Sequence, residues 1–92
     1  MIYQGDTVRL KVNFRNFSGI NVDPTETKLT IYDMYKNQME QFILDDANKE
    51  NVGVYFYDYT PATELSDFIF EFSGLYNNHP TVVRDSLKIK FN

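Results

Sequence analysis

The fold class of this 92-residue chain is decided by the stretch TVRLKVNFR at residues 7–15. Its apolar side chains, Val8, Leu10, Val12 and Phe14, stand at every second position, with polar or charged side chains between them. Successive side chains of a β-strand point to opposite faces, so this period of two predicts a strand with one buried face. Such a sheet must pack its apolar face against a second sheet or close on itself.

Similar patterns continue along the rest of the chain. We expect further strands at 26–33, 38–44, 52–59, 68–72 and 81–91. Alternation in 38–44 is imperfect and fits a bulged strand. A bulge near 84–86 would let the strand at 81–91 pair in two sheets. Regularly spaced short strands predict an all-β fold, either a sandwich or a small barrel, in one domain spanning residues 1–92.

Polar segments rich in Gly, Asn, Asp and Pro separate these runs. We interpret 16–24 as a loop, 36–37 as a hairpin turn, 45–51 as a polar connection and 74–80 as a turn. Thr60 followed by Pro61 could begin one helical turn within 60–66.

Composition and charge exclude several classes of function. The chain has no Cys, which excludes disulfides, thiolate zinc sites and cysteine nucleophiles. Thirteen acidic against nine basic residues give a formal charge of -4, which argues against binding to nucleic acid or to an anionic membrane. The sequence has no signal-peptide pattern, so we expect a cytoplasmic origin.

Candidate catalytic and ion-binding residues are few. The single histidine, His79, stands between Asn78 and Pro80 and is expected to be an exposed turn residue. The acidic residues of 45–51 and Asp58 form no spacing that favours a tuned carboxylate pair, and 46–57 lacks the Gly and Glu of an EF-hand loop. We therefore predict no enzyme activity, no catalytic residue, no metal and no cofactor.

Aromatic residues are the best candidates for a binding surface. Tyr55, Tyr57 and Tyr59 form a row on one face of the strand predicted at 52–59, and Phe17 lies in a polar loop. Tyr and Phe contribute much of the energy of protein interfaces, so we predict partner binding by these four residues. Burial of the tyrosine row in the core is the equally weighted alternative.

Several segments together resemble one family. These are Gly5 to Val12, the Val22-Asp23-Pro24-Thr25 loop, Leu29 to Asp33, Phe70 to Gly74 and Val82 to Asp85. They are similar to small immunoglobulin-like domains of bacteriophages and prophages of Gram-positive bacteria, including the N-terminal domains of upper baseplate proteins. The resemblance implies an immunoglobulin-like antiparallel β-sandwich of about seven strands, without the paired cysteines and core tryptophan of antibody domains.

The resemblance also implies a function. It predicts a non-enzymatic structural or accessory protein of the phage head, neck or tail, which binds other virion proteins or itself and can be a homo-oligomer. Its place would be the bacterial cytoplasm during assembly and then the virion. The alternative is a carbohydrate-binding module that recognises a glycan of the host surface, since exposed Tyr rings can stack on sugars.

Overall fold

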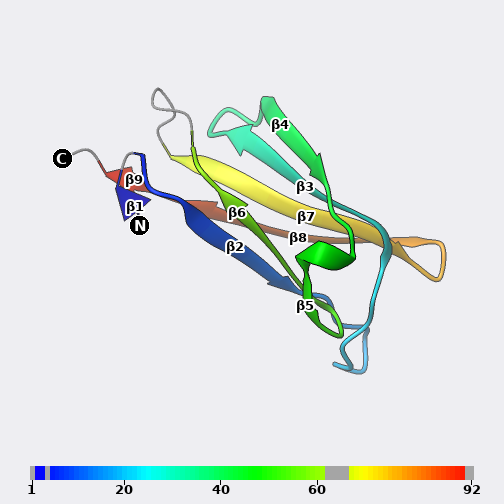
Figure 1. The fold of residues 1–92 in the computed structure, drawn as a ribbon. Coiled ribbons are helices and arrows are strands. Elements are labelled where there is room, and N and C mark those ends of the chain that lie inside the picture. The colour runs from blue at the N-terminus through cyan, green and yellow to red at the C-terminus, as the bar shows by residue number, and fades with distance from the viewer. Residues whose placement is uncertain (1, 4, 62–66, 91–92) are drawn as a thin grey trace.

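The computed structural model of the chain describes residues 2–3, 5–61 and 67–90, and Figure 1 shows their arrangement. Within these ranges the backbone forms short strands and one turn of 3-10 helix, which follow one another in a fixed order. They are β1 (Ile2–Tyr3), β2 (Val8–Asn13), β3 (Thr25–Asp33), β4 (Gln38–Ile43), η1 (Asp46–Asn48), β5 (Lys49–Asn51), β6 (Val54–Tyr59), β7 (Phe68–Tyr76), β8 (His79–Leu87) and β9 (Ile89–Lys90).

Seven of these strands form two antiparallel sheets. One sheet has the order β2-β6-β5 and the other the order β4-β3-β7-β8, while β1 pairs in parallel with β9. Figure 1 shows the two sheets as separate layers of a sandwich. The described residues contain no α-helix, and none of their helices is long and apolar enough to cross a membrane. The predicted all-β antiparallel sandwich is confirmed.

The strand order is immunoglobulin-like. When β2 to β8 take the letters B, C, C′, D, E, F and G, one sheet reads B-E-D and the other C′-C-F-G. Immunoglobulin variable domains divide these strands between their sheets in the same way. Within the described residues no A strand lies beside β2, and β1 pairs only with β9 at the end of the last strand.

The core lies between the two sheets and is built from alternate residues of each strand. Of the predicted inward side chains of the first strand, Leu10, Val12 and Phe14 are buried, and Val8 is partly buried. The opposite sheet contributes residues that are completely buried, namely Leu29, Ile31, Phe68 and Phe72. Packing of these side chains joins the central strands in a chain that has no cysteine.

The bulge expected in 38–44 is confirmed. Ile31 pairs with Glu40, whereas the next residue, Tyr32, pairs with Gln38, so Met39 is the extra residue of β4. Phe42 and Leu44 pack on the core, whereas Met39 and Ile43 are exposed, so the irregular pattern comes from these two exposed apolar residues.

The segment 45–53 differs from its prediction. The polar connection contains η1, which Asp45 caps by accepting a hydrogen bond from the Ala47 N–H, and the short strand β5. Val52 and Gly53 form the turn between β5 and β6, so β6 begins at Val54 instead of Val52. The reason is Gly53, whose φ of 73° is in the left-handed region that favours glycine.

The segment 74–90 also differs. β7 continues through Gly74 to Tyr76, and the turn consists only of Asn77 and Asn78, whose φ angles are 51° and 63°. Two residues of positive φ are typical of a type I′ hairpin, in which Asn is tolerated. Nine consecutive pairs join β7 to β8, so the expected bulge at 84–86 is absent and the strand ends at Leu87.

Two expectations lie wholly or partly outside the described residues. The helical turn expected at 60–66 falls largely on residues 62–66, and the last strand expected at 81–91 ends on residue 91.

Candidate binding site

The structure places the tyrosine row (Tyr55, Tyr57 and Tyr59) against the core. Tyr55 is 6% exposed and Tyr59 is 3% exposed, and Tyr57 is partly buried. The predicted partner surface is therefore wrong for Tyr55 and Tyr59, and the buried alternative describes them.

Each ring of the tyrosine row packs on a phenylalanine. The Tyr55 and Phe14 centroids lie 5.9 Å apart edge to face, those of Tyr57 and Phe42 lie 4.4 Å apart and stacked, and those of Tyr59 and Phe68 lie 5.5 Å apart edge to face. Such aromatic pairs add to the energy of burial. The row thus joins β6 to β4 and β7 of the opposite sheet and to the residue that follows β2.

The phenol of Tyr59 has a polar partner, although its ring is buried. Its hydroxyl donates a hydrogen bond to the Glu40 carboxylate on β4. Burial, followed by the bond to Glu40, raises the pKa of Tyr59, and burial likewise raises the pKa of Tyr55. Both phenols therefore remain neutral and serve the core as aromatic rings.

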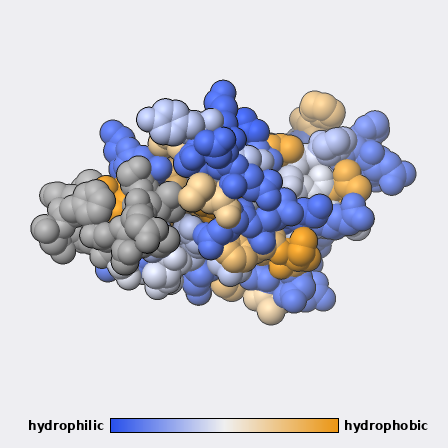
Figure 2. Space-filling model, turned by 90° about the horizontal axis from the view of Figure 1, so that it is seen from above, coloured by the Kyte–Doolittle hydropathy of each residue, from blue (hydrophilic) through white to orange (hydrophobic). Residues whose placement is uncertain are grey.

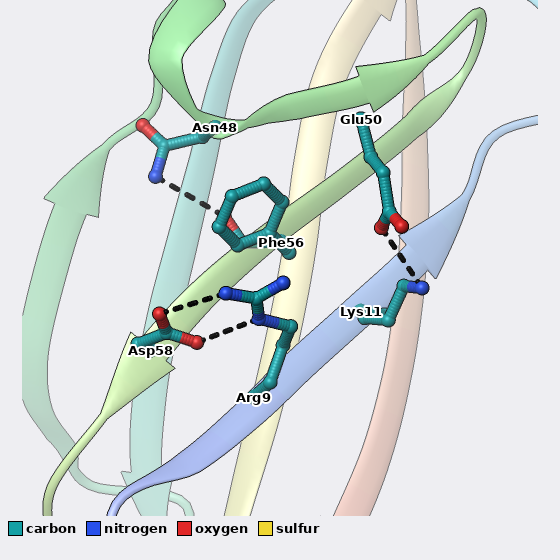
Figure 3. Close-up of polar contacts among 6 residues, drawn as sticks. All are labelled: Arg9, Lys11, Asn48, Glu50, Phe56 and Asp58. Carbon is teal, nitrogen blue, oxygen red and sulfur yellow. Dashed lines mark hydrogen bonds and ion pairs between the residues drawn. The ribbon is translucent and has the colours of Figure 1, made fainter.

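The opposite face of β6 points outward and has its own charges paired (Figure 3). The Arg9 guanidinium donates two hydrogen bonds to Asp58, of 2.8 and 3.1 Å, and lies 4.2 Å from the centroid of the Phe56 ring. Lys11 forms an ion pair of 2.8 Å with Glu50. The bond from Arg9 lowers the pKa of Asp58. Because these charges satisfy one another, this face presents no unpaired cluster for a ligand.

Phe17 has the opposite environment to the tyrosine row. It lies in the segment 14–24 that joins β2 to β3, here called the Phe17 loop, and its side chain is fully exposed at 112%. Single exposed apolar side chains are normal on a protein surface, so the exposure of Phe17 shows that its ring is accessible. The predicted binding role of Phe17 therefore has the required accessibility.

Hydrogen bonds within the Phe17 loop fix its shape. The side-chain oxygen of Asn16 accepts hydrogen bonds from the Ser18 and Ile20 amides, at 2.9 and 3.1 Å. The Gly19 amide donates to the Asn16 carbonyl at 3.0 Å, and the φ of Gly19 is 78°. The Asn side chain here replaces backbone partners as in an Asx turn. Phe17 is therefore held outward by an ordered turn.

The base of the Phe17 loop is fastened to the turn between β5 and β6. The Phe14 amide donates to the Gly53 carbonyl at 2.8 Å. The Asp23 carboxylate accepts hydrogen bonds of 2.7 Å from the Gly53 amide and from the Lys49 ammonium. These bonds, Lys49 first, lower the pKa of Asp23. Both ends of the loop thus meet at Gly53.

A hollow of about 660 Å³ separates the Phe17 loop from the β7–β8 hairpin. We call it the loop-end hollow. Figure 1 shows the loop and the hairpin at the same end of the molecule. Its lining comes from these two segments alone and consists of Arg15, Asn16, Phe17, Tyr76, Asn77, His79, Pro80 and Thr81.

The loop-end hollow lies where immunoglobulin variable domains bind their ligands. In the lettering given above, the Phe17 loop is the B–C loop and the β7–β8 turn is the F–G loop. These two loops carry part of the binding surface of variable domains. The likeness is one of position in the fold, and a fold does not by itself imply a function.

The sequence indicates Phe17 as a candidate binding residue but none of the hairpin residues that line the hollow. Tyr76, His79 and Pro80 were assigned to a turn, although the Asn77-Asn78 pair flanked by β-prone residues is a recognisable hairpin signal. Their approach to Phe17 spans about sixty positions of the chain, and only the sandwich topology reveals it.

The hollow offers apolar contact and hydrogen bonds. His79 is exposed at the start of β8, in agreement with the expected exposed histidine, although it lies in a strand and not in a turn. In the parts of the chain that the structure describes, no three His, Asp or Glu side chains come together in a way that could hold a metal ion. The arrangement is suited to binding a surface or a small ligand through rings and amides.

Comparison of the chain with protein-family models, with curated proteins and with solved structures finds no match.

Proposed function

We propose that this chain is a non-enzymatic structural or accessory domain of a phage or prophage virion, part of the head, neck or tail, and that it acts through protein-protein contacts. The observation that carries the proposal is Phe17, a fully exposed aromatic ring on a hydrogen-bonded loop beside an apolar hollow. Its partner is another virion protein. Nucleic acid and membranes are not among the partners proposed.

The energetics of Phe17 support a contact with protein. Burial of one exposed Phe side chain is worth about 1.5–3 kcal/mol. An ordered loop loses little further freedom when it docks, so most of this energy is retained on binding. Exposed rings that insert into a partner are typical of the residues that dominate interface energies.

The phage assignment rests on the resemblance of specific segments. Gly5 to Val12 leads into and forms β2, Leu29 to Asp33 lies in β3, and Val82 to Asp85 lies in β8. The resemblance covers strands of both sheets, and a phage domain of this kind would assemble in the bacterial cytoplasm and remain in the virion.

The test is detection of the chain in purified particles, induced from a strain that carries the gene and analysed by quantitative mass spectrometry. A fixed copy number per particle is expected for the original chain. We expect Phe17→Ser to lower that copy number by about tenfold or more, which corresponds to loss of one buried anchor. The matched control is Tyr35→Ser, since Tyr35 is 87% exposed at the β3–β4 turn.

Two results would contradict the proposal. Particles that lack the chain altogether would remove the virion role. Particles that incorporate the Phe17→Ser and Tyr35→Ser variants equally would keep the virion role but remove Phe17 as the anchor.

A carbohydrate-binding module is the second candidate, and the lining of the hollow favours it over other ligand classes. Phe17 and Tyr76 offer rings there, and Asn77 and His79 offer hydrogen-bonding groups to sugar hydroxyls. The tyrosine row no longer supplies a platform, because two of its rings are buried. Shifts of the His79 and Asn77 amide signals on addition of host cell-wall glycans would support this candidate, and an unchanged spectrum would remove it.

A further inference from the structure

The strand β8 leaves one backbone edge unpaired. It is the last strand of the sheet β4-β3-β7-β8, and within the described residues no strand lies on its other side. Nine residues, His79–Leu87, pair with β7 without a register shift. A long regular edge presents a row of amide and carbonyl groups that can pair with another strand.

The other three edges of the two sheets are shorter or interrupted. β5 has three residues, and the bulge at Met39 interrupts the regular pattern of β4. β2 has six residues, and its outward side chains Arg9 and Lys11 are charged. Short length, bulges and charge are the devices that protect sheet edges from pairing. β8 carries Pro80, Arg84 and Asp85, which are protective residues too, but it is the longest of the four edge strands and pairs with β7 without a bulge.

Two valines on β8 are exposed, and one of them faces the inside of the sandwich. Val83 pairs with Phe72 and points to the same side of the sheet, yet Phe72 is completely buried and Val83 is 40% exposed. The inner face of the sheet is therefore covered at Phe72 on β7 but only partly at Val83 on β8. Val82, on the other face of β8, is 52% exposed.

The broad surface seen in Figure 2 offers no comparable feature. Its apolar side chains form small patches separated by hydrophilic ones. Scattered apolar residues are normal on a soluble protein. A contact through the strand edge is therefore better supported than one through that surface.

We propose that β8 pairs with β8 of a second copy of this chain, antiparallel and about a two-fold axis at Val83. Val83 is the midpoint of His79–Leu87, so this register places every residue of the strand opposite another, and Pro80 is the one residue of β8 that has no N–H to donate. The two four-stranded sheets then continue across the axis as one sheet of eight strands. A two-fold contact of this kind is closed, so it covers the edge of both copies and leaves no edge of β8 for a third copy.

The side chains of β8 are self-complementary in this register. Val83 lies opposite Val83 of the second copy, Thr81 opposite Asp85, and Val82 opposite Arg84. A threonine hydroxyl can donate to a carboxylate, and no like charges face one another.

Other registers are less favourable. An axis at Arg84 or at Asp85 places that residue opposite its own copy, which brings like charges together. An axis nearer the hairpin leaves Leu87 unpaired. Charge and length therefore favour the Val83 register and, with it, a second copy of the chain as the occupant of this edge.

The first test is the mass of the purified 92-residue chain, measured by light scattering behind size exclusion over a range of concentrations. We expect the mass of two chains at high concentration. Val83→Asp places two carboxylates at the axis and should raise the dimer dissociation constant by about tenfold or more. Ile43→Asp is the matched control, because Ile43 is 70% exposed on β4, the other edge of the same sheet.

A second pair of variants keeps the test independent of folding. Thr81→Lys faces Asp85 of the second copy and should tighten the dimer, whereas Thr81→Asp should weaken it. Each contact occurs twice by symmetry, so we expect the two dissociation constants to differ by about tenfold. Melting temperatures of all variants show that each one folds.

A monomer at every concentration would overturn this proposal, as would Val83→Asp weakening the dimer no more than Ile43→Asp. Thr81→Lys and Thr81→Asp acting alike would overturn the register. The dimer does not require Phe17, so Phe17→Ser should leave the mass unchanged. Failure of the virion proposal and failure of the dimer are therefore separate results.

Discussion

The tyrosine row on β6 and the Phe17 loop both present aromatic residues, yet they have opposite roles in the structure. Tyr55 and Tyr59 are 6% and 3% exposed, whereas Phe17 is fully exposed. The row belongs to a strand whose side chains alternate between core and solvent, and Phe17 belongs to a turn fixed by Asn16. Aromatic content alone therefore identifies neither a core nor an interface. Whether a ring is buried or exposed depends on the strand or turn that carries it.

Truncation of a ring should affect stability most in the tyrosine row and least in the Phe17 loop. Tyr59→Ala should lower the free energy of unfolding by about 3–5 kcal/mol, since it empties a buried site between Phe42 and Phe68. Phe17→Ala should change it by less than about 0.5 kcal/mol, as is usual for exposed positions. Urea denaturation measures both values, and similar losses for the two variants would refute the contrast.

The base of the Phe17 loop provides the next test. Gly53→Ala places a Cβ 2.7 Å from the Phe14 carbonyl oxygen and 2.9 Å from that of Val22, at a positive φ that alanine rarely adopts. We expect a loss of about 2–3 kcal/mol in the free energy of unfolding. Gly19→Ala is the matched control, because its positive φ is similar and no atom lies within 4 Å of the added Cβ. A smaller effect at Gly53 than at Gly19 would show that the loop base is not packed as described.

Asp23 gives a smaller, pH-dependent effect at the same place. Its pKa is lowered below the ordinary 3.8 by Lys49 and by the Gly53 amide. A lowered pKa in the folded state stabilises the fold fully above the ordinary value, and this contribution is lost as the pH falls through the lowered one. Asp23→Asn should cost about 1 kcal/mol at neutral pH.

The sign of the pH effect follows from that linkage. The difference between Asp23→Asn and the original chain should be constant near neutral pH and should shrink below pH 3.8. Thermal melts across this range measure it. A difference that grows on acidification would mean that Asp23 is not ionised and bonded in the folded state.

The smallest effect is expected at the β7–β8 hairpin. Asn78→Gly should raise the free energy of unfolding by about 0.5 kcal/mol, because Asn-Gly is the favoured pair for a type I′ turn and the φ of Asn78 is 63°. Asn51→Gly, in the short strand β5, is a control that should not stabilise. If Asn78→Gly destabilised the chain, the hairpin assignment would be wrong.

Much of the fold was predictable from the sequence because the first strand alternates so regularly. Leu10, Val12 and Phe14 face the core as expected, and Arg9 and Lys11 face outward. Spacing and turn residues predict six of the seven strands of the two sheets but leave a sandwich and a small barrel as alternatives, and β5 lies in the segment predicted as a polar connection. The extra pairing of β1 with β9 was not predictable, since two residues give no periodic signal.

The orientation of β6 was harder to predict because both of its faces carry apolar residues. Val54 and Phe56 alternate with the tyrosine row, so hydrophobicity alone does not choose between the faces. Asp58 was the available signal. It shares a face with Val54 and Phe56, and a carboxylate there points to solvent, where it meets Arg9.

The measurement that tests this contrast most directly is hydroxyl-radical footprinting of the native chain, read residue by residue by mass spectrometry. The structure predicts rapid oxidation of Phe17 and protection of Tyr55 and Tyr59, with the protection lost on unfolding. Oxidation of Tyr55 and Tyr59 as fast as that of Phe17 would contradict the structure, because it would mean that the tyrosine row is exposed.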